Sequence, residues 1–343
     1  MTLLDALQQD GGASIAMATA LYTTTLKHMP GVWRFLYSSW SRLPGMESFR
    51  VSWMTHRFRE TEKVLRRLDP DVVLTTHPLA TAIASRMKSR GRLFPRLVTT
   101  FSDWHFQRFW CFPHVDHYLV GVPRQRADLI ATGVDPGVVT VSGLLVAPGY
   151  RIHVPAAEAR RRLQLPQERS VILVLGGGGG WGLEPLVRDV ARMETPLCAV
   201  VLCGSAERRT QLERMLAGIR SGSAEIRLLA FEPDPAPYFH AVDLIVGKPG
   251  GISTAQAFAC GTPVLAVSPL PGHEEANLAE LTRNGAVLVP LANETPAAAI
   301  RRLLHCRDLL QQTVALARRL VALDTEAIAL AVLAGLTPMN HRQ

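Results

Sequence analysis

Short β-branched runs alternate with helical stretches along most of this chain, and no other feature restricts its fold as strongly. One series begins with DVVLTT and ends with VVTVSG, and a second begins with SVILVL and ends with AVLVP. Strands that alternate with helices in this way form parallel sheets with crossover helices. The pattern therefore predicts two α/β domains, the second with an open sheet of about six strands.

Residues 144–168 interrupt this alternation, because Pro148 and Gly149 are followed by the charged stretch AAEARRRLQLPQER. Such a change in composition is typical of a domain boundary. We expect residues 1–150 to form a first Rossmann-like domain, residues 151–321 to form a second, and residues 322–343 to form a C-terminal helix and tail.

The beginning of the first domain lacks the usual opening strand. A doubly wound domain commonly starts with a strand and a glycine-rich turn, whereas the first clear strand here begins near Val72. We therefore expect a first domain that is truncated, without its first strand and loop, and that has fewer strands than the second.

Basic and aromatic residues are concentrated between residues 27 and 67. The chain carries a net charge of +8 at pH 7, and its basic excess lies mainly in this segment. Aromatic rings interleaved with cations suit either nucleic acid or anionic lipid headgroups. Because no recognised nucleic-acid motif accompanies the charge, we favour a membrane-facing surface, with these candidate residues: Trp33, Arg34, Trp40, Arg42, Arg50 and Trp53.

Nothing in the sequence predicts export or a membrane span. The first residues, MTLLDALQQDGG, lack the basic and apolar regions of a secretory signal. No uninterrupted apolar run approaches the ~20 residues that a spanning helix needs. The five cysteines form no CxxC pair and lie mostly in apolar runs, as reduced core cysteines do. We expect a cytoplasmic protein that is peripheral on the inner face of the cell membrane.

Glycines follow the first strand of the second domain. Gly176 to Gly180 come directly after SVILVL and precede a predicted helix. Glycine lets backbone N–H groups approach a ligand closely, and a helix N-terminus favours an anion. We therefore include Gly179 and Gly180 in the predicted binding site, with an ordinary turn as the alternative.

A second glycine turn gives a stronger signal. The strand DLIVGK ends at Lys248, and the turn Pro249-Gly250-Gly251 frees backbone amides ahead of a helix that we expect Ser253 and Thr254 to cap. A diphosphate fits these amides, the two hydroxyls and the helix dipole.

Polar side chains follow the next strand, PVLAVS. The loop SPLPG leads into a helix that begins with His273 and Glu274 and carries Asn277. Because these side chains come after a strand's carboxyl end, they are placed to recognise the hydroxyl groups of a sugar.

The motifs KPGG, QAFACGTPV, PLPGHEEAN and NGA stand in an order and spacing that resembles the donor-binding region of glycosyltransferase family 28. The similarity is greatest to the monogalactosyldiacylglycerol synthases and the processive diacylglycerol glucosyltransferases. It extends upstream through PDVVLTTHPL, VTTFSDWHFQRFWCFPHVDHYLVGV and VLGGGGGWG, and covers roughly residues 1–310.

This resemblance implies the GT-B architecture, in which two Rossmann-like domains face a cleft, the first binding the acceptor and the second a UDP-sugar donor. It implies an inverting reaction that needs neither a metal nor another cofactor. Phe231 matches the position whose backbone meets uracil, and Gln256 the position that contacts ribose. The full donor-binding set that it implies is Phe231, Gly250, Gly251, Ile252, Ser253, Thr254, Gln256, His273, Glu274 and Asn277.

Several positions depart from the family pattern. The family usually has Glu at position 256 and Gln at position 273, and it commonly has His at position 107, where this chain has Gln. The glycine-rich loop ending in His, which carries the family's usual catalytic base, has no counterpart. His77 and Asp103, each at the end of a predicted first-domain strand, are the remaining catalytic candidates, with a helix or loop cap as the alternative role of each.

We therefore expect a hexosyltransferase that moves a hexose from a UDP-sugar to a lipid such as diacylglycerol. One alternative is the transfer of N-acetylglucosamine to a lipid-linked cell-wall precursor. A second, motivated by the absent base loop, is a nucleotide-sugar binding protein without turnover.

Overall fold

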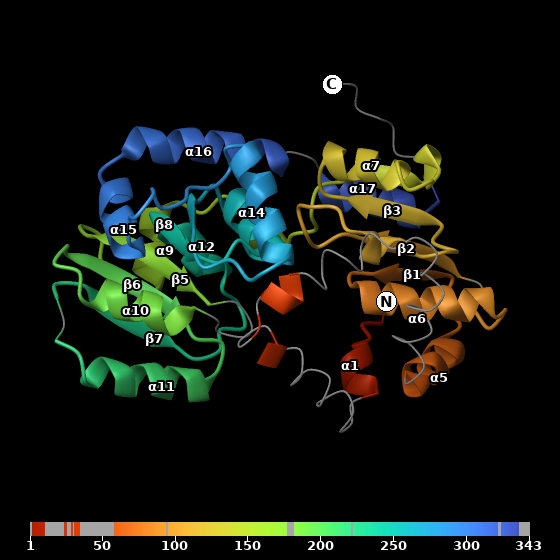
Figure 1. Cartoon of the computed structure of the whole chain (residues 1–343), viewed down its shortest axis with the longest axis horizontal. Coiled ribbons are helices and arrows are strands. Elements are labelled where there is room, and N and C mark those ends of the chain that lie inside the picture. Colours follow the sequence, from red (N-terminus) through yellow and green to blue (C-terminus); the bar gives the residue numbers. More distant parts are fainter. Residues whose placement is uncertain are drawn as a thin grey trace. The chain divides into compact units, whose positions relative to one another are not determined.

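The computed structural model describes residues 2–10, 24–25, 29, 31–34, 58–93, 95–176, 182–220, 222–321 and 324–335. The chain forms two compact units (Figure 1). The first contains Met1–Leu145, Pro271–His273 and Leu323–Gln343, and the second contains Val146–Leu270 and Glu274–Ala322.

The first unit is built on a parallel sheet with the strand order β1-β2-β3-β4. The register pairs Leu74 with Val98, and Tyr118 of β3 with both Thr99 and Val139. Its helices and strands are α1 (Ala6–Gln9), α5 (Arg59–Leu68), β1 (Val72–Thr75), α6 (Pro78–Ser89), β2 (Arg96–Thr100), β3 (His117–Val120), α7 (Pro123–Ile130), β4 (Val139–Val141) and α17 (Thr325–Leu333). All four strands therefore end at one edge of the sheet, and the loops that follow them lie along that edge.

Helix α17 returns from the end of the chain to the first sheet. Ala329 and Val332 of this helix pack against Val98 of β2 and Leu119 of β3, and all four side chains are buried. Figure 1 shows α17 beside β3 and α7. The apolar contacts of α17 thus cover β2 and β3, which explains why Val98 and Leu119 are apolar.

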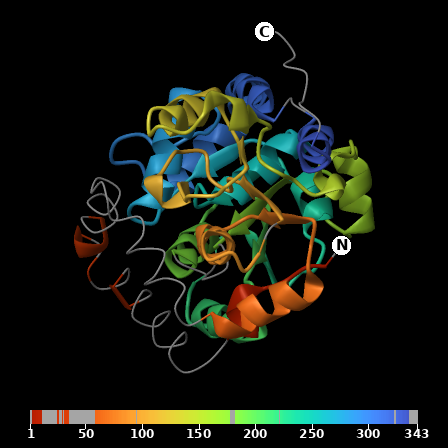
Figure 2. The same cartoon turned by 90° about the vertical axis from the view of Figure 1, so that its right-hand side faces the viewer.

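The N-terminal residues are attached to the same unit by a helix cap. The carboxylate of Asp10 accepts hydrogen bonds from the backbone N–H groups of Glu60 and Thr61, at 2.7 and 2.8 Å. These N–H groups begin α5 and have no partner inside that helix. Ala6 of α1 packs against the core beneath α5 and α6, and Figure 2 turns this part of the first unit toward the viewer.

The second unit is a parallel sheet with the strand order β7-β6-β5-β8-β9. The order reverses at β5, which pairs with β6 on one side and β8 on the other. Its elements are α8 (Pro148–Arg151), α9 (Ala156–Arg162), β5 (Ser170–Leu175), α10 (Leu183–Ala191), β6 (Leu197–Leu202), α11 (Ala206–Ala217), β7 (Glu225–Leu229), α12 (Ala236–Ala241), β8 (Leu244–Gly247), α13 (Gly251–Cys260), β9 (Val264–Ala266), α14 (His273–Arg283), α15 (Pro296–Leu304) and α16 (Arg307–Leu320).

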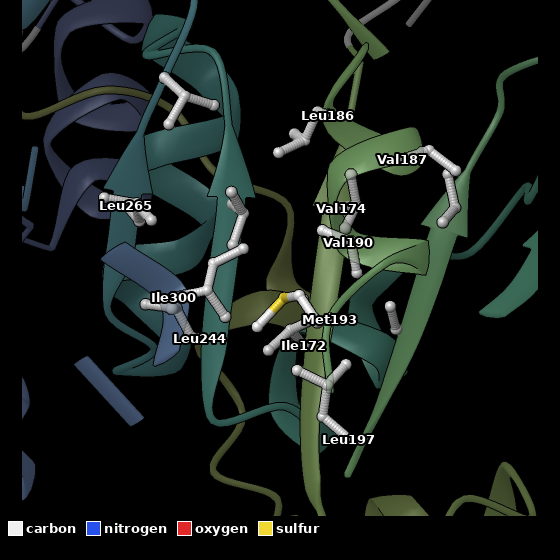
Figure 3. Packing of buried hydrophobic residues seen from close by; sticks show 14 of the residues in the cluster. Ile172, Val174, Leu186, Val187, Val190, Met193, Leu197, Leu244, Leu265 and Ile300 are labelled. Atoms are coloured by element: carbon white, nitrogen blue, oxygen red, sulfur yellow. The ribbon is translucent and has the colours of Figure 1, made fainter. Parts of the chain in front are cut away.

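The largest core cluster among the described residues lies between this second sheet and the helices α10, α11 and α15 (Figure 3). Ile172 and Val174 of β5 point into the cluster together with Val187 of α10 and Ile300 of α15, and all four are fully buried. Each such side chain contributes roughly 1.5–3 kcal/mol through burial. The cluster holds β5 and β8 side by side, which fixes the positions of the loops at their carboxyl ends.

The start of the second unit is joined to its sheet by a buried arginine. Arg160 of α9 donates from Nε to the carbonyl oxygen of Ala241 at 2.7 Å, and it pairs with Asp243 at 2.8 Å. Asp243 also accepts from the backbone N–H of Val171 at 2.8 Å. Every member of this network has a partner, and it lies where β5 and β8 begin.

The two predicted strand series are present, with one exception in the described part of the chain. AVLVP, expected as a sixth strand, makes only an isolated parallel bridge between Leu288 and Leu265. The described residues therefore contain four strands in the first unit and five in the second. The first unit ends at Leu145 in this part of the chain, whereas the boundary predicted from the sequence is residue 150.

Candidate active site

The carboxyl ends of β5 and β8 form the switch point of the second sheet, which is where open α/β sheets bind their ligands. Leu175 pairs with Gly247 at this point. A Cβ atom on Gly247 would lie 2.5 Å from the carbonyl oxygen of Leu175, so only glycine allows this approach. The loops after both strands are the two glycine turns found in the sequence.

Helix α13 begins at the second of these turns. Gly250 is its N-cap residue, with extended backbone angles and no side-chain cap. The first intrahelical bond runs from the N–H of Thr254 to the carbonyl of Gly250 at 3.0 Å. The N–H groups of Gly251, Ile252 and Ser253 therefore have no partner within the helix and are oriented to bind an anion.

Helix α13 begins at Gly251, earlier than the start predicted from the sequence. Ser253 and Thr254 do not cap it but lie in its first turn, because the two glycines let helical geometry begin at Gly251. Thr254 is buried, and its hydroxyl donates to the carbonyl oxygens of Gly250 and Gly251 at 2.7 and 3.0 Å. These two bonds stabilise the first turn of the helix. The hydroxyl of Ser253, which is half-buried, is therefore better placed to bind a ligand.

Two further predicted donor-binding residues lie on α13. Ile252 is 38% exposed and Gln256, one turn later, is half-buried. Phe231 follows β7 at the same edge of the sheet and is 73% exposed. Its position after a strand's carboxyl end fits a backbone contact with a flat base, which leaves the ring in solvent. Gly179 and Gly180 lie outside the described residues.

A buried ion pair joins the end of β8 to the start of α14. Nζ of Lys248 lies 3.4 Å from Oε1 of Glu274, and the two side chains are 9% and 7% exposed. Oε2 of Glu274 accepts from the backbone N–H of Leu270 at 2.7 Å. Asn277 lies on the same helix and is fully buried, and His273 is the first helical residue. Of the residues predicted to recognise the sugar, His273, Glu274 and Asn277, Glu274 therefore already makes contacts within the protein.

The loop after β9 approaches the start of α10, the helix that follows β5. Gly182, the N-cap of α10, has a φ of +72°, and a Cβ on it would lie 3.1 Å from Cβ of Ser268. Ser268 itself has a φ of +49°. Positive φ at a residue other than glycine is a strained conformation that accumulates at functional sites. Loops from three adjacent strands thus meet at this edge.

The first sheet presents His77 and Asp103 at its own carboxyl edge. His77 is the N-cap of α6, with Nδ1 accepting from the backbone N–H of Leu79 at 3.2 Å. Desolvation by surrounding protein lowers the pKa of His77 below its ordinary value, and the carboxylate of Asp103 opposes that shift. The histidine is therefore neutral at pH 7.

The cap also decides the tautomer of His77. An Nδ1 that accepts a hydrogen bond has its lone pair engaged, so the ring proton sits on Nε2. In this form Nε2 can donate to a substrate but cannot take up a proton. Of the two catalytic candidates, Asp103 is thus the one whose side chain can accept a proton without breaking a helix cap.

Gln125 fixes the loop that carries Asp103. This buried side chain donates from Nε2 to the carbonyl oxygens of Asp103 and His105 at 2.6 and 2.9 Å. Its Oε1 accepts from the N–H groups of Gly121 and Val122 at 2.7 and 3.2 Å. One amide therefore ties the loop after β2 to the loop after β3.

Two buried polar atoms beside this loop make no hydrogen bond within the described residues, Oγ1 of Thr100 and Nε2 of Gln107. Buried polar atoms are normally satisfied, so each such case calls for an explanation. Gln107 could be singled out from the sequence, because the family commonly has His at this position. No sequence feature indicates a role for Thr100 or Gln125. Lys248 could have been predicted as a site residue, because it is a charged residue directly after a buried strand, but the predicted site does not include it.

Only part of the predicted membrane-facing set can be described. Arg34 is exposed and Trp33 is half-buried, both in a short helical segment. The other four lie outside the described residues: Trp40, Arg42, Arg50 and Trp53. Of the helices that the structure describes, none has the length and apolar character to cross a membrane.

The two parallel sheets, with a helix that begins at the switch point of the second, define a two-domain α/β protein of the GT-B class. Among solved structures of similar fold are MurG from Acinetobacter baumannii, with a TM-score of 0.51 at 17% identity over 78% of this chain and 74% of that one. Anabaena HepE in complex with UDP and glucose reaches a TM-score of 0.54 at 15% identity, covering 83% of each chain. A UDP-GlcNAc 2-epimerase from Neisseria meningitidis bound to UDP-GlcNAc reaches 0.52 at 13% identity, covering 85% of this chain and 83% of that one.

Family models identify both domains. Residues 1–146 match the monogalactosyldiacylglycerol synthase family, and residues 156–320 match the glycosyl transferases group 1 family. A processive diacylglycerol β-glucosyltransferase from Bacillus subtilis is 24% identical over 71% of this chain and 63% of its own length. The enzyme of the same name from Bacillus pumilus is 22% identical over 89% of this chain and 79% of its own length. The resemblance predicted from the sequence is confirmed, and the chain spans just under two thirds of the first of these relatives.

Proposed function

We propose that this chain is a hexosyltransferase that moves a hexose from a UDP-sugar to the hydroxyl group of a membrane lipid such as diacylglycerol. The observation that carries the proposal is the start of α13, where three backbone N–H groups have no helical partner and where Lys248, in the preceding turn, pairs with Glu274 of α14. Both matched families support sugar transfer in preference to the epimerase reaction of one of the proteins with a similar fold.

The transfer is proposed to invert the anomeric centre. The lipid hydroxyl oxygen attacks the anomeric carbon, a base accepts its proton, and the bond from that carbon to the diphosphate oxygen breaks. Asp103 is our candidate for the base, and His77 is a donor from Nε2. The departing UDP gains negative charge, which the amides and dipole of α13 stabilise. We propose that no metal is required for this step.

The decisive experiment is mass spectrometry of lipid products after incubation of diacylglycerol with UDP-glucose, UDP-galactose and UDP-N-acetylglucosamine in parallel. We expect a hexosyl lipid, unchanged when EDTA is present, and NMR of the product should show a β linkage formed from an α-linked donor. A product only from UDP-N-acetylglucosamine and a lipid-linked cell-wall precursor would favour the first alternative. Tight UDP binding with no transfer to any lipid would favour a nucleotide-sugar binding protein.

The donor site can be tested separately by calorimetry with UDP. Ser253→Phe should weaken UDP binding at least tenfold, because the bulky side chain obstructs the amides of α13. Ala206→Phe, at the exposed first turn of α11, is the matched control and should leave UDP affinity unchanged. Equal UDP affinity in both variants would show that the diphosphate binds elsewhere.

We also propose that the protein acts while bound to the cytoplasmic face of an anionic membrane. Arg34 is exposed, and the basic segment continues into Arg59, which is exposed at the start of α5. Neutralising Arg34, Arg42 and Arg50 together should reduce binding to phosphatidylserine vesicles by about 1 kcal/mol per charge close to the surface. Equal partitioning of the variant and the parent at low salt would refute this surface.

A further inference from the structure

Lys248 lies in the middle of the candidate donor site, yet its charge is directed into the protein. It is the first residue after β8, next to the turn that starts α13. Only 9% of its side chain is exposed, and its ammonium nitrogen lies 3.4 Å from the carboxylate of Glu274. The positive charge of Lys248 is therefore already paired with a protein carboxylate before any diphosphate binds.

The carboxylate of Glu274 is held from two directions. Lys248 approaches Oε1, and the backbone N–H of Leu270 donates to Oε2 at 2.7 Å. Each carboxylate oxygen can accept more than one hydrogen bond. Glu274 therefore keeps acceptor capacity for the hydroxyl groups of a ligand, while its orientation is fixed before the ligand arrives.

The ion pair is difficult to explain as a device for stability. Removing two charges from water is costly, and a buried ion pair is often no better for stability than apolar residues of the same size. It does give one thing that an apolar pair cannot, a charged acceptor in a fixed direction. Charged acceptors bind hydroxyl donors more strongly than neutral ones.

We infer that Lys248 is a positioning residue for the hexose: it holds the Glu274 carboxylate oriented toward the sugar hydroxyls, and it makes no direct contact with UDP. This inference rests on the proposed function, since it assumes that the donor carries a sugar. The two parts of the donor are then bound by different residues. The turn and the start of α13 bind UDP, and Glu274, positioned by Lys248, binds the hexose.

The test compares three variants of the full chain: Lys248→Met, Glu274→Gln and the double variant. Arg209→Met, which removes an exposed ion pair with Glu213 on α11 of the second unit, is the matched control. Calorimetry measures the Kd of UDP and of the UDP-hexose that the parent uses, and steady-state assays measure kcat and KM for transfer.

We expect Lys248→Met to bind UDP within threefold of the parent, to lose at least tenfold in affinity for the UDP-hexose, and to fall about 100-fold in kcat/KM. Because Lys248 acts through Glu274, the double variant should be no worse than Glu274→Gln alone. Arg209→Met should match the parent in every measurement.

Two results would overturn the inference. An equal loss of UDP and UDP-hexose affinity in Lys248→Met would show that the lysine binds the diphosphate, and independent additive losses in the double variant would show that it does not act through Glu274. If Lys248→Met unfolds, the double variant, which leaves no unpaired charge, supplies the comparison with Glu274→Gln. A parent that binds UDP-hexose but transfers nothing would remove the proposed function and leave the calorimetric test intact.

Discussion

Replacing His77 with asparagine or alanine separates its role as a helix cap from a role in catalysis. Asparagine can accept a hydrogen bond from the N–H of Leu79, as Nδ1 of His77 does at 3.2 Å, whereas alanine cannot. Loss of an N-cap costs about 1 kcal/mol, and exchange of one good cap residue for another costs little. We therefore expect His77→Ala to unfold at a lower urea concentration and His77→Asn to match the parent.

The transfer rate then distinguishes the two roles. If His77 only caps α6 and donates from Nε2, His77→Asn should retain at least a tenth of the parent's kcat. Loss of a general base costs about 10²- to 10⁴-fold, and we expect a loss of that size in Asp103→Asn. Initial rates of hexosyl lipid formation, measured at a temperature where urea curves show both variants folded, give the comparison. A folded His77→Asn variant with a rate more than 100-fold below the parent would refute the reasoning and make His77 the base.

The pH dependence of stability provides an independent check on the same residue. The folded state lowers the pKa of His77 below its ordinary value of 6.5, so the unfolded chain binds this proton first as the pH falls. The free energy of unfolding should therefore decrease below pH 6.5, and this part of the decrease should be missing in His77→Asn. Identical pH profiles for the variant and the parent would contradict the assigned neutral state.

Three further outcomes follow from the described contacts. Gln125→Met removes four hydrogen bonds at the Asp103 loop without leaving a cavity, and orphaned buried groups cost about 1–3 kcal/mol each, so urea unfolding should show a loss of about 3–5 kcal/mol. Gly247→Ala should destabilise strongly because its Cβ would lie 2.5 Å from a backbone carbonyl of β5, whereas Gly218→Ala, with its nearest neighbour at 3.7 Å, should not. Arg302, together with the backbone N–H of Leu291, lowers the pKa of Glu294 to about 2, so the stability from these bonds should be lost as the pH falls from 4.5 toward 2, and carboxyl NMR should show a raised pKa in Arg302→Gln.

Strand positions could be predicted from the sequence because the apolar runs of a parallel sheet are buried on both faces. Leu173 and Val200, for example, are almost completely buried within runs that could form nothing else. The run AVLVP was predicted as a strand and forms only one bridge, since β-propensity carries no information on whether a partner edge is close enough.

The loops of the candidate site could be located from glycines, but their detailed geometry could not. Two glycines at 250 and 251 indicate a tight turn, yet they equally allow the helix to begin two residues before the expected hydroxyl cap. The pairing of Lys248 with Glu274 and the bonds of Gln125 join residues that lie far apart in the chain or on different loops. Contacts of this kind depend on tertiary structure, and no local pattern encodes them.

The polar groups at the two edges of the second sheet differ in a way that bears on function. At the edge where β5 and β8 begin, Arg160 and Asp243 satisfy one another and the neighbouring backbone, as a network kept for folding should. At the edge where these strands end, α13 leaves N–H groups without helical partners, and Lys248 and Glu274 are buried where apolar residues would fold as well. Departures from good packing that occur together at one edge are expected where a sequence serves binding as well as folding. The carboxyl edge is therefore where selection for a ligand, and not for stability alone, best explains the residues that are present.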